Sequence, residues 1–311
     1  MSTSKKTPVD KHALAENPET SRARLATLSR NAYAPIRQAV AQNPNTSSKT
    51  LTELADDRDT RVFVGVSAGG NDTERDKIEN AALMNPNIPV EVLSRVAREA
   101  PVLGVFHRLD AVAQNPNTPA DALAHLWSAA SSGYAFESSG LHIHLLESLA
   151  GNPSNTPEQL MLMAEEHKDH RNIMGSLAQN PASPADALRF IMANMPPAEA
   201  PKHEHDIASF RQRTDAAVYV ARNEGIPQEI VEELLSHPNE QARVWLARNE
   251  GMSAETLDML ADDAYPPVRA DVALNPNTEI RTLTKLAVDT FRPASRRATR
   301  RLEAMSTAEA A

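Results

Sequence analysis

The sequence contains no cysteine, which excludes disulfide bonds and metal sites built from thiolates. Aromatic residues make up only 4% of the chain, so its core must be built mainly from aliphatic side chains. No run approaches the roughly 18 apolar residues of a membrane span, and the first residues, MSTSKKTPVD, lack the apolar core of a signal peptide. We therefore expect a soluble, cytoplasmic protein that makes no contact with a membrane.

Motifs of catalysis are missing as well. No nucleophile stands in a recognisable pattern with a base and an orienting acid, and Gly69-Gly70 lacks the Lys-Ser/Thr of a phosphate-binding loop. We therefore expect no catalytic residues, no enzymatic activity and no cofactor.

The chain has little excess of positive charge. Its formal net charge is −9, which disfavours nonspecific binding of the whole molecule to nucleic acid. Arginines do crowd the expected last helix, and a solvated cap that stops further stacking is the favoured interpretation. The alternative is a patch that contacts phosphate or an acidic partner, formed by Arg296, Arg297, Arg300 and Arg301.

A repeated pattern is present instead, marked by an asparagine that Pro or Glu follows. These anchors are Asn17, Asn43, Asn85, Asn115, Asn152, Asn180, Asn223, Asn249 and Asn275. The base interval between anchors is 26 residues, and a Leu or Val stands eight residues past every one of them. Another large apolar residue stands eleven past each anchor, which completes the stripe of an amphipathic helix. The pattern predicts nine repeats in which this helix, helix A, comes first.

A second, shorter helix is expected before each anchor. Val or Leu lies three residues before seven of the anchors and Ala follows it, and the proline after the anchor ends the helix. We call this element helix B. Hydroxyl residues three past five anchors are predicted to cap helix A, with Pro119 and Pro184 at its first position. These residues are Thr20, Thr46, Thr118, Ser183 and Thr278.

The expected fold class is all-α, a solenoid of stacked two-helix repeats. A capping half repeat should occupy residues 1–16, a single solenoid domain residues 17–301, and a frayed tail residues 302–311. Extra residues in repeats 2–6 are expected as loops, inserted mainly between helix A and helix B.

The pattern resembles the variant leucine-rich repeat family of bacterial helical solenoids. The resemblance rests on NPNT at 43, 115 and 275 joined to the L-x-x-L spacing, and it covers nearly the whole chain. HEAT-type repeats share the hydrophobic spacing alone. The resemblance implies a right-handed superhelix and a role in interactions. Some members carry a cysteine-bound iron–sulfur module, which cannot exist here without cysteine.

Three further groups of polar residues need an interpretation. The anchor asparagines are expected to bond their own turns, because Asn does so readily. Arg37, Arg243 and Arg269 share one position of helix B and are expected to form internal braces, with Asp262 or Asp263 as partner of Arg269. The alternative is that these arginines bind a partner.

Histidines gather in or beside the inserted loops and are expected to be solvated rather than to bind a metal. They are His107, His125, His142, His144, His167, His170, His203 and His205.

One surface feature stands out four residues before the anchors, at a position expected to point away from the apolar stripe. The residue there is usually small, but Tyr219 and Trp245 occupy it in adjacent repeats, with Arg222 and Arg248 three residues further on. Tyr, Trp and Arg dominate binding hot spots, so these four residues are the candidate partner-binding site. The alternative is that the aromatics only pack against a loop or a neighbouring repeat.

The sequence thus favours a non-catalytic scaffold that binds a protein or peptide. The second hypothesis is a nucleic-acid-binding protein of the HEAT-like type, which a continuous basic groove would support. The partner itself is not encoded in any motif that we recognise.

Overall fold

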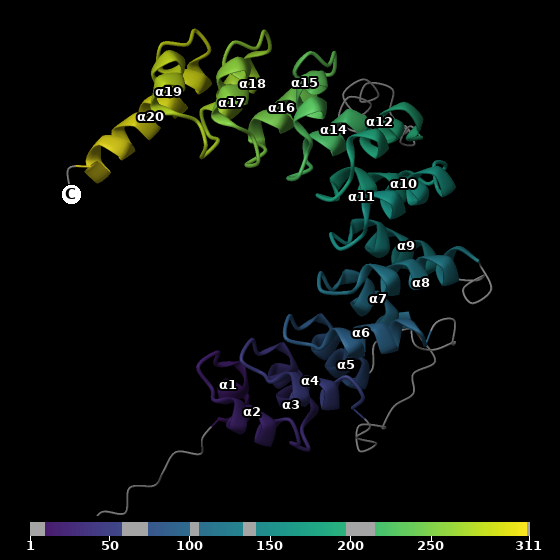
Figure 1. The fold of residues 1–311 in the computed structure, drawn as a ribbon. Helices are drawn as coiled ribbons and strands as arrows, with labels where there is room; N and C mark the ends of the chain where they lie inside the picture. The colour runs from purple at the N-terminus through teal and green to yellow at the C-terminus, as the bar shows by residue number, and fades with distance from the viewer. Residues whose placement is uncertain (1–9, 58–73, 100–105, 133–140, 197–214, 310–311) are drawn as a thin grey trace, which may run out of the picture. The chain divides into compact units, whose positions relative to one another are not determined.

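The computed structural model describes residues 10–57, 74–99, 106–132, 141–196 and 215–309. Within these ranges it contains nineteen helices and no strand, which confirms the all-α class (Figure 1). The chain forms two compact units, Met1–Asn155 and Thr156–Ala311, called unit 1 and unit 2 below. The predicted single domain over 17–301 remains a prediction.

In both units, helices pack against a neighbour in the chain, against the helix one step further, or against both. Unit 1 contains α1 (Lys11–Glu16), α2 (Arg22–Leu28), α3 (Ala34–Gln42), α4 (Ser48–Leu54), α5 (Glu74–Met84), α6 (Val90–Ala97), α7 (Phe106–Gln114), α8 (Ala120–Ser131) and α9 (Leu141–Gly151). Unit 2 contains α10 (Pro157–Glu166), α11 (Arg171–Gln179), α12 (Ala185–Asn194), α14 (Ala216–Ala221), α15 (Gln228–Leu235), α16 (Glu240–Arg248), α17 (Ala254–Leu260), α18 (Pro266–Val272), α19 (Ile280–Ala287) and α20 (Arg292–Glu309).

The core consists of the two predicted apolar stripes. The residues eight past the anchors are all buried: Leu25, Leu51, Leu93, Leu123, Leu160, Leu188, Val231, Leu257 and Leu283. Three residues before the later anchors, helix B buries Val40, Val112, Leu149, Leu177, Val220, Leu246 and Val272. Helices of this length are marginal alone in water, so burial of these stripes against neighbouring helices is what stabilises them.

The hydroxyl residues three past the anchors do not cap helix A, and that prediction is wrong. Each donates instead to the carbonyl six residues earlier, at the end of helix B, as Thr46 Oγ1 does to the Val40 carbonyl at 2.6 Å. The same bond is made by Thr20, Thr118, Ser183 and Thr278. The N-cap of helix A lies one residue later, at Ser21, Ser47, Pro119, Pro184 and Glu279 respectively. The hydroxyl therefore satisfies a carbonyl that the helix itself leaves open.

The anchor asparagines bond their own turns, as predicted. In all nine, Oδ1 accepts the backbone N–H two residues later, at 2.8–3.0 Å. The sequence did not predict that the amide nitrogen also reaches the preceding turn. Asn249 Nδ2, for example, donates to the carbonyls of Ala221 and Asn223. Equivalent bonds join Asn43, Asn85, Asn115, Asn152, Asn223 and Asn275 to the turn before each of them.

The three helix B arginines are internal braces, as expected. Each Nε donates to an aspartate 20 residues later: Arg37 to Asp57, Arg243 to Asp263 and Arg269 to Asp289, at 2.6–2.8 Å. The proposed side-chain pairing of Arg269 with Asp262 or Asp263 is therefore wrong. Besides Asp289, Arg269 bonds the backbone carbonyl of Asp263, at 2.8 Å, and not the side chain of that residue. The brace thus spans two successive helix pairs instead of closing one.

The expected inserted loops in repeats 2, 3, 4 and 6 fall mainly on 58–73, 100–105, 133–140 and 197–214, outside the described residues. Most of the expected half repeat at 1–16 also lies outside, apart from its helix α1. Residues 302–309, expected to fray, continue α20 as helix.

Candidate functional site

The residues four before the last three anchors lie on alternate helices of unit 2. Tyr219 is on α14, Trp245 on α16 and Asp271 on α18, and these helices pack side by side in that order. Arg297, 26 residues past Asp271, continues the row on α20, which packs against α18. The side chain four residues before an anchor does not face solvent in every repeat, because Ala39 and Ala111, at this position in unit 1, are buried.

Three arginine side chains lie near the two aromatic rings, and one of them, Arg222, is close to both. The Cζ atom of Arg222 lies 4.0 Å from the centroid of the Trp245 ring and 5.7 Å from that of Tyr219. Arg248 lies 5.1 Å from the Trp245 centroid, and Arg171 lies 5.3 Å from that of Tyr219. These are cation–π distances. We call these five residues the arginine–aromatic ladder.

Four members of the arginine–aromatic ladder were predicted from the sequence to lie together, namely Tyr219, Arg222, Trp245 and Arg248. Arg171 was not predicted. It belongs to α11, nine residues before its anchor, where no repeated spacing marks it. Asp271 was also missed, although it holds the same position as Tyr219 and Trp245. Because Asp271 is acidic, the sequence could have identified it as the partner of a neighbouring arginine.

Tyr219 packs on a neighbouring helix, which agrees in part with the alternative interpretation of the aromatic residues. A Cβ atom added at Gly175 of α11 would lie only 3.2 Å from the Tyr219 ring, so the glycine makes room for that ring. Tyr219 and Trp245 are both half-buried. The aromatics are therefore neither a bare platform nor part of the core.

The arginines of the ladder differ in how their charge is balanced. Arg248 Nε donates to Asp271 Oδ2 at 2.8 Å, and Arg297 donates to the other oxygen of the same carboxylate at 2.9 Å. The guanidinium of Arg222 has no hydrogen-bond or ion-pair partner among the described residues, and its Nε is buried without an acceptor. One carboxylate thus serves two arginines, while the guanidinium of Arg222 lies near two aromatic rings.

The four carboxy-terminal arginines do not act as one patch. Arg297 pairs with Asp271, and Arg301 donates to the carbonyls of Ala273 and Asn275. Arg301 stands 26 residues past Asn275 and makes the bonds that an anchor amide makes elsewhere. Burial lowers the pKa of its guanidinium.

The exposed side chains in this group are Arg296 and Arg300, for which the described part of the structure shows no partner. They are therefore the members still open to a phosphate or an acidic partner.

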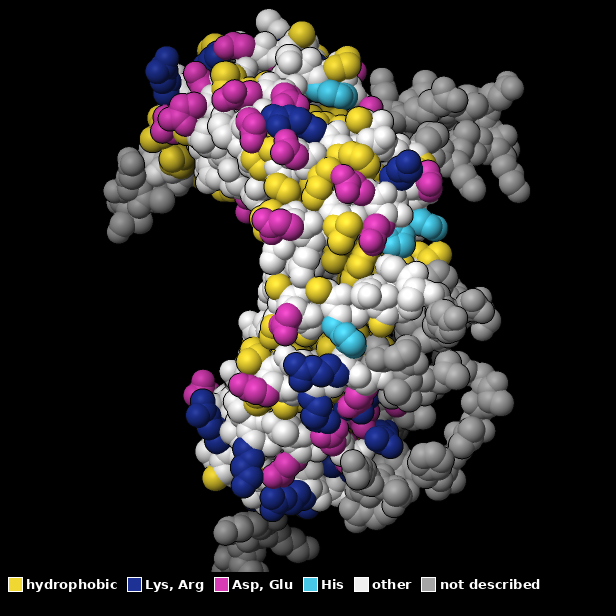
Figure 2. All heavy atoms as spheres, turned by 45° about the vertical axis from the view of Figure 1, so that its right-hand side comes forward, with side chains coloured by type: hydrophobic (Ala, Val, Ile, Leu, Met, Phe, Trp, Pro, Cys, Tyr) yellow, Lys and Arg dark blue, Asp and Glu magenta, His cyan; other side chains and the backbone are white. Residues whose placement is uncertain are grey.

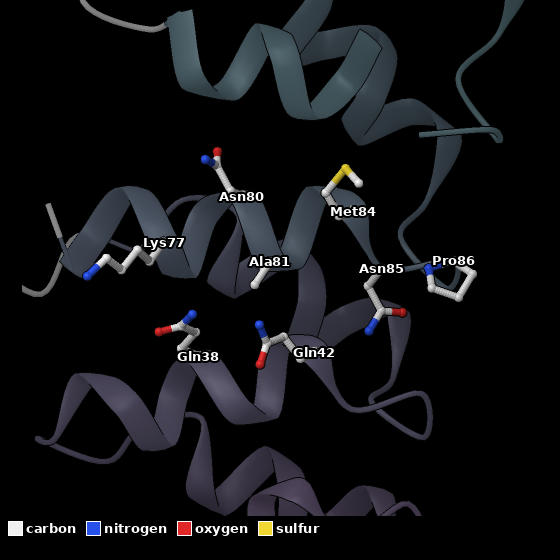
Figure 3. Close-up of a pocket in the computed structure, with 8 residues that line it drawn as sticks. All are labelled: Gln38, Gln42, Lys77, Asn80, Ala81, Met84, Asn85 and Pro86. Atoms are coloured by element: carbon white, nitrogen blue, oxygen red, sulfur yellow. The ribbon is translucent and has the colours of Figure 1, made fainter. Parts of the chain in front are cut away.

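Unit 1 has a hollow where unit 2 has large side chains. A space of about 420 Å³ lies between α3 and α5, beside the small Ala81, which holds the position of Tyr219 and Trp245. Gln38 and Gln42 reach from α3 toward α5, and Asn80 projects from α5 (Figure 3). Small residues at this position therefore leave room that the ladder fills in unit 2.

Histidines form no metal site in the described ranges, where no group of three or more His, Asp or Glu residues could hold an ion. His125 lies on α8 and His144 on α9, the two helices that flank residues 133–140. His144 Nδ1 lies 3.3 Å from the Asp110 carboxylate. His203 and His205 lie outside the described residues.

Charged side chains of both signs lie next to one another on the face drawn in Figure 2. No helix in the described ranges is both long enough and apolar enough to cross a membrane. Neither the models of known protein families nor the curated proteins include a match to this sequence. The geometry of the ladder must therefore carry the functional argument.

Proposed function

We propose that this chain is a right-handed α-solenoid of two-helix repeats, similar to the variant leucine-rich repeat family, and a non-catalytic scaffold for a protein partner. The repeat architecture is supported by the anchor asparagines, whose amides link one turn to the preceding one about 26 residues earlier in the most regular part. Such bonds suit a stack in which each repeat contacts its neighbours.

The arginine–aromatic ladder is the observation that carries the proposed binding role. Side chains of the three types that dominate interface hot spots lie together in unit 2, on adjacent helices. Their mutual contacts fix their orientation before any partner arrives, which reduces the entropy lost on binding. Exposed edges of these groups are then available for a protein contact.

The same contacts disfavour the nucleic-acid hypothesis. Single strands bind when their bases stack on bare aromatic faces. Trp245 has arginines within 4.0 and 5.1 Å of its ring centroid, and Tyr219 has two at 5.3 and 5.7 Å. The rings thus have guanidinium groups where bases would stack. A chain with a net charge of −9 also repels a polyanion.

The proposal is tested by affinity capture from an extract of the native cell, with the immobilised chain and two variants. Trp245→Ala should reduce a retained protein at least about tenfold, as removal of a hot-spot residue does. Tyr33→Ala is the matched control, because Tyr33 is an aromatic side chain in unit 1 that is 62% exposed. It should leave retention unchanged. Retention of the same proteins by all three chains would refute a binding role of the ladder.

The nucleic-acid alternative has its own test, a titration of labelled duplex DNA. We expect weak binding that collapses between about 50 and 200 mM salt, because only exposed arginines contribute. Arg296→Gln combined with Arg300→Gln should remove most of it. Tight binding that tolerates salt would instead support the nucleic-acid function.

A further inference from the structure

Two arginines of unit 2 hold the same position in successive repeats but have different neighbours. Arg222 and Arg248 each stand one residue before an anchor. The residue 23 positions after Arg248 is Asp271, whose Oδ2 accepts the Nε–H of Arg248 at 2.8 Å. At the same separation from Arg222 stands Trp245, whose ring centroid lies 4.0 Å from the Arg222 Cζ atom. The next helix B therefore brings a carboxylate to one arginine and an indole ring to the other.

The indole leaves the charge of Arg222 without a counter-ion. An aromatic face attracts a cation, but it does not accept the charge-assisted N–H···O bond that Asp271 accepts from Arg248. Nε of Arg222 is enclosed without an acceptor, whereas its two terminal nitrogens are not enclosed and have no partner in the described ranges either. The terminal N–H groups of Arg222 are therefore open to an acceptor from outside the chain.

The following repeat shows which acceptor suits an arginine at this position. Asp271 uses both of its oxygens on guanidinium groups, Oδ2 for Arg248 and Oδ1 for Arg297. A planar carboxylate matches the fork of N–H groups on a guanidinium, and such pairs are among the stronger hydrogen bonds in proteins. The comparison between the two repeats therefore favours a carboxylate as the group that Arg222 lacks.

We propose that Arg222 binds a carboxylate of the protein partner, an Asp or Glu side chain that takes the role Asp271 has beside Arg248. The proposal rests on the scaffold function proposed above and adds the chemical group that the partner presents. Trp245 occupies the position from which an internal acid would neutralise Arg222. Its ring, together with that of Tyr219 at 5.7 Å, holds the guanidinium in place.

The test uses the capped amino acids acetyl-Glu-NH₂ and acetyl-Gln-NH₂, which differ in a single carboxylate. Nuclear magnetic resonance of the full chain with isotope-labelled arginine follows the Nε–H signal of Arg222, identified as the signal that Arg222→Gln lacks. At constant ionic strength, acetyl-Glu-NH₂ should shift this signal saturably with a Kd of about 1–10 mM, as a single ion pair allows. Acetyl-Gln-NH₂ should leave it unchanged.

Three results of this titration would overturn the proposal. The first is the absence of a saturable shift with acetyl-Glu-NH₂. The second is an equal shift with acetyl-Gln-NH₂, because the carboxylate would then be irrelevant. The third is binding of inorganic phosphate at least about tenfold more tightly than acetyl-Glu-NH₂, because Arg222 would then be a phosphate site.

A matched pair of substitutions at Trp245 separates a missing internal acid from general attraction between charges. Trp245→Asp supplies the acid that Asp271 supplies in the next repeat, so it should weaken binding of acetyl-Glu-NH₂ at Arg222 at least about tenfold. Trp245→Asn has nearly the same shape without the charge and should weaken it less than about threefold. Equal losses in the two variants would overturn the proposal.

The converse change is made at Asp271. In Asp271→Asn, Arg248 loses its carboxylate, so acetyl-Glu-NH₂ should shift the Nε–H signal of Arg248 with an affinity within about threefold of that at Arg222. In the natural chain the Arg248 site should bind at least about tenfold more weakly, because Asp271 already neutralises it. An Arg248 signal that responds equally in both chains would contradict the proposal.

Capture of the native partner distinguishes this inference from the scaffold function. Loss of retention in both Trp245→Ala and Arg222→Gln supports the two together. Loss in Trp245→Ala with full retention by Arg222→Gln would keep the scaffold function and overturn the role of Arg222. Full retention by both variants would overturn the scaffold function, and with it the partner as the source of the carboxylate.

Discussion

The substitution Asn223→Ala tests the structural role of the anchor amides. Asn223 is fully buried, and its Nδ2 donates to the carbonyls of Ala178 and Asn180 at 3.0 and 2.7 Å. Its Oδ1 accepts the Gly225 N–H at 2.8 Å. The Asn180 carbonyl also accepts the N–H of Ser183, so it keeps a partner in the variant.

The Ala178 carbonyl has no such second partner in the described structure. The residue three positions later is Pro181, which has no N–H, and the N–H of Ala182 bonds the Asn180 side chain. Asn223→Ala therefore leaves the buried Ala178 carbonyl without a partner, while the N–H of the exposed Gly225 loses its acceptor and can bond water. At roughly 1–3 kcal/mol for one buried group left without a partner, the free energy of unfolding should fall by about 2 kcal/mol.

Urea unfolding followed by tryptophan fluorescence measures this loss. The chain has two tryptophans, Trp127 in unit 1 and Trp245 in unit 2, so a Trp127→Phe background reports unit 2 alone. Asn194→Ala is the control, because that exposed amide bonds the Phe190 carbonyl of its own helix, at 2.8 Å, and no other group among the described residues. It should cost less than about 0.5 kcal/mol. Equal losses in Asn223→Ala and the control would refute the reasoning that these amides stabilise the stack.

Three further predictions concern unit 2. Arg301→Ala should lower the free energy of unfolding by about 2 kcal/mol, because it removes bonds to turn carbonyls, while the exposed Arg300→Ala should cost less than about 0.5 kcal/mol in the same urea assay. The bond from Arg269 lowers the pKa of Asp289 below its ordinary value of 3.8, so this carboxylate stabilises the fold above that pH and loses its contribution as the pH falls through the folded pKa. The stability gap between the natural chain and Asp289→Asn should therefore narrow below about pH 4 in unfolding experiments, and a constant gap would contradict the pairing. Trp245→Ala should cost about 2 kcal/mol in thermal melts, between the values for an exposed and a fully buried tryptophan, because the ring is half-buried and has two arginine contacts; a loss above about 4 kcal/mol would show that the ring is a core residue.

The buried positions of each helix could be predicted from the sequence, because they depend on the spacing of apolar residues within one helix. Leu257 and Leu260 lie one turn apart on α17 and both are buried, as their spacing predicts. The local Asx turn at each anchor was readable for the same reason, since Asn249 Oδ1 bonds an N–H only two residues away. Short-range geometry follows from residue types and their separation.

The sequence did not predict as well which group on another helix or turn each side chain would bond. Thr46 could in principle bond the helix after it or the helix before it, and the packing of the turn determines that it bonds the Val40 carbonyl. Arg269 has acids near it in the sequence, yet the orientation of the next helix pair brings Asp289 to it. In both cases several partners satisfy the chemistry equally well, and three-dimensional distance decides among them.

The sequence by itself determined the helices, the two buried stripes and the coincidence of Tyr219 and Trp245 at one position of adjacent helices. Those features follow from periodicities of 3.6 and 26 residues, which are properties of the chain alone. Only the tertiary structure decided that Arg222 lies between these rings without a carboxylate, while Asp271 neutralises Arg248. The physical reason is that side-chain contacts between helices depend on how the helices pack, which brings together residues that are distant in the chain.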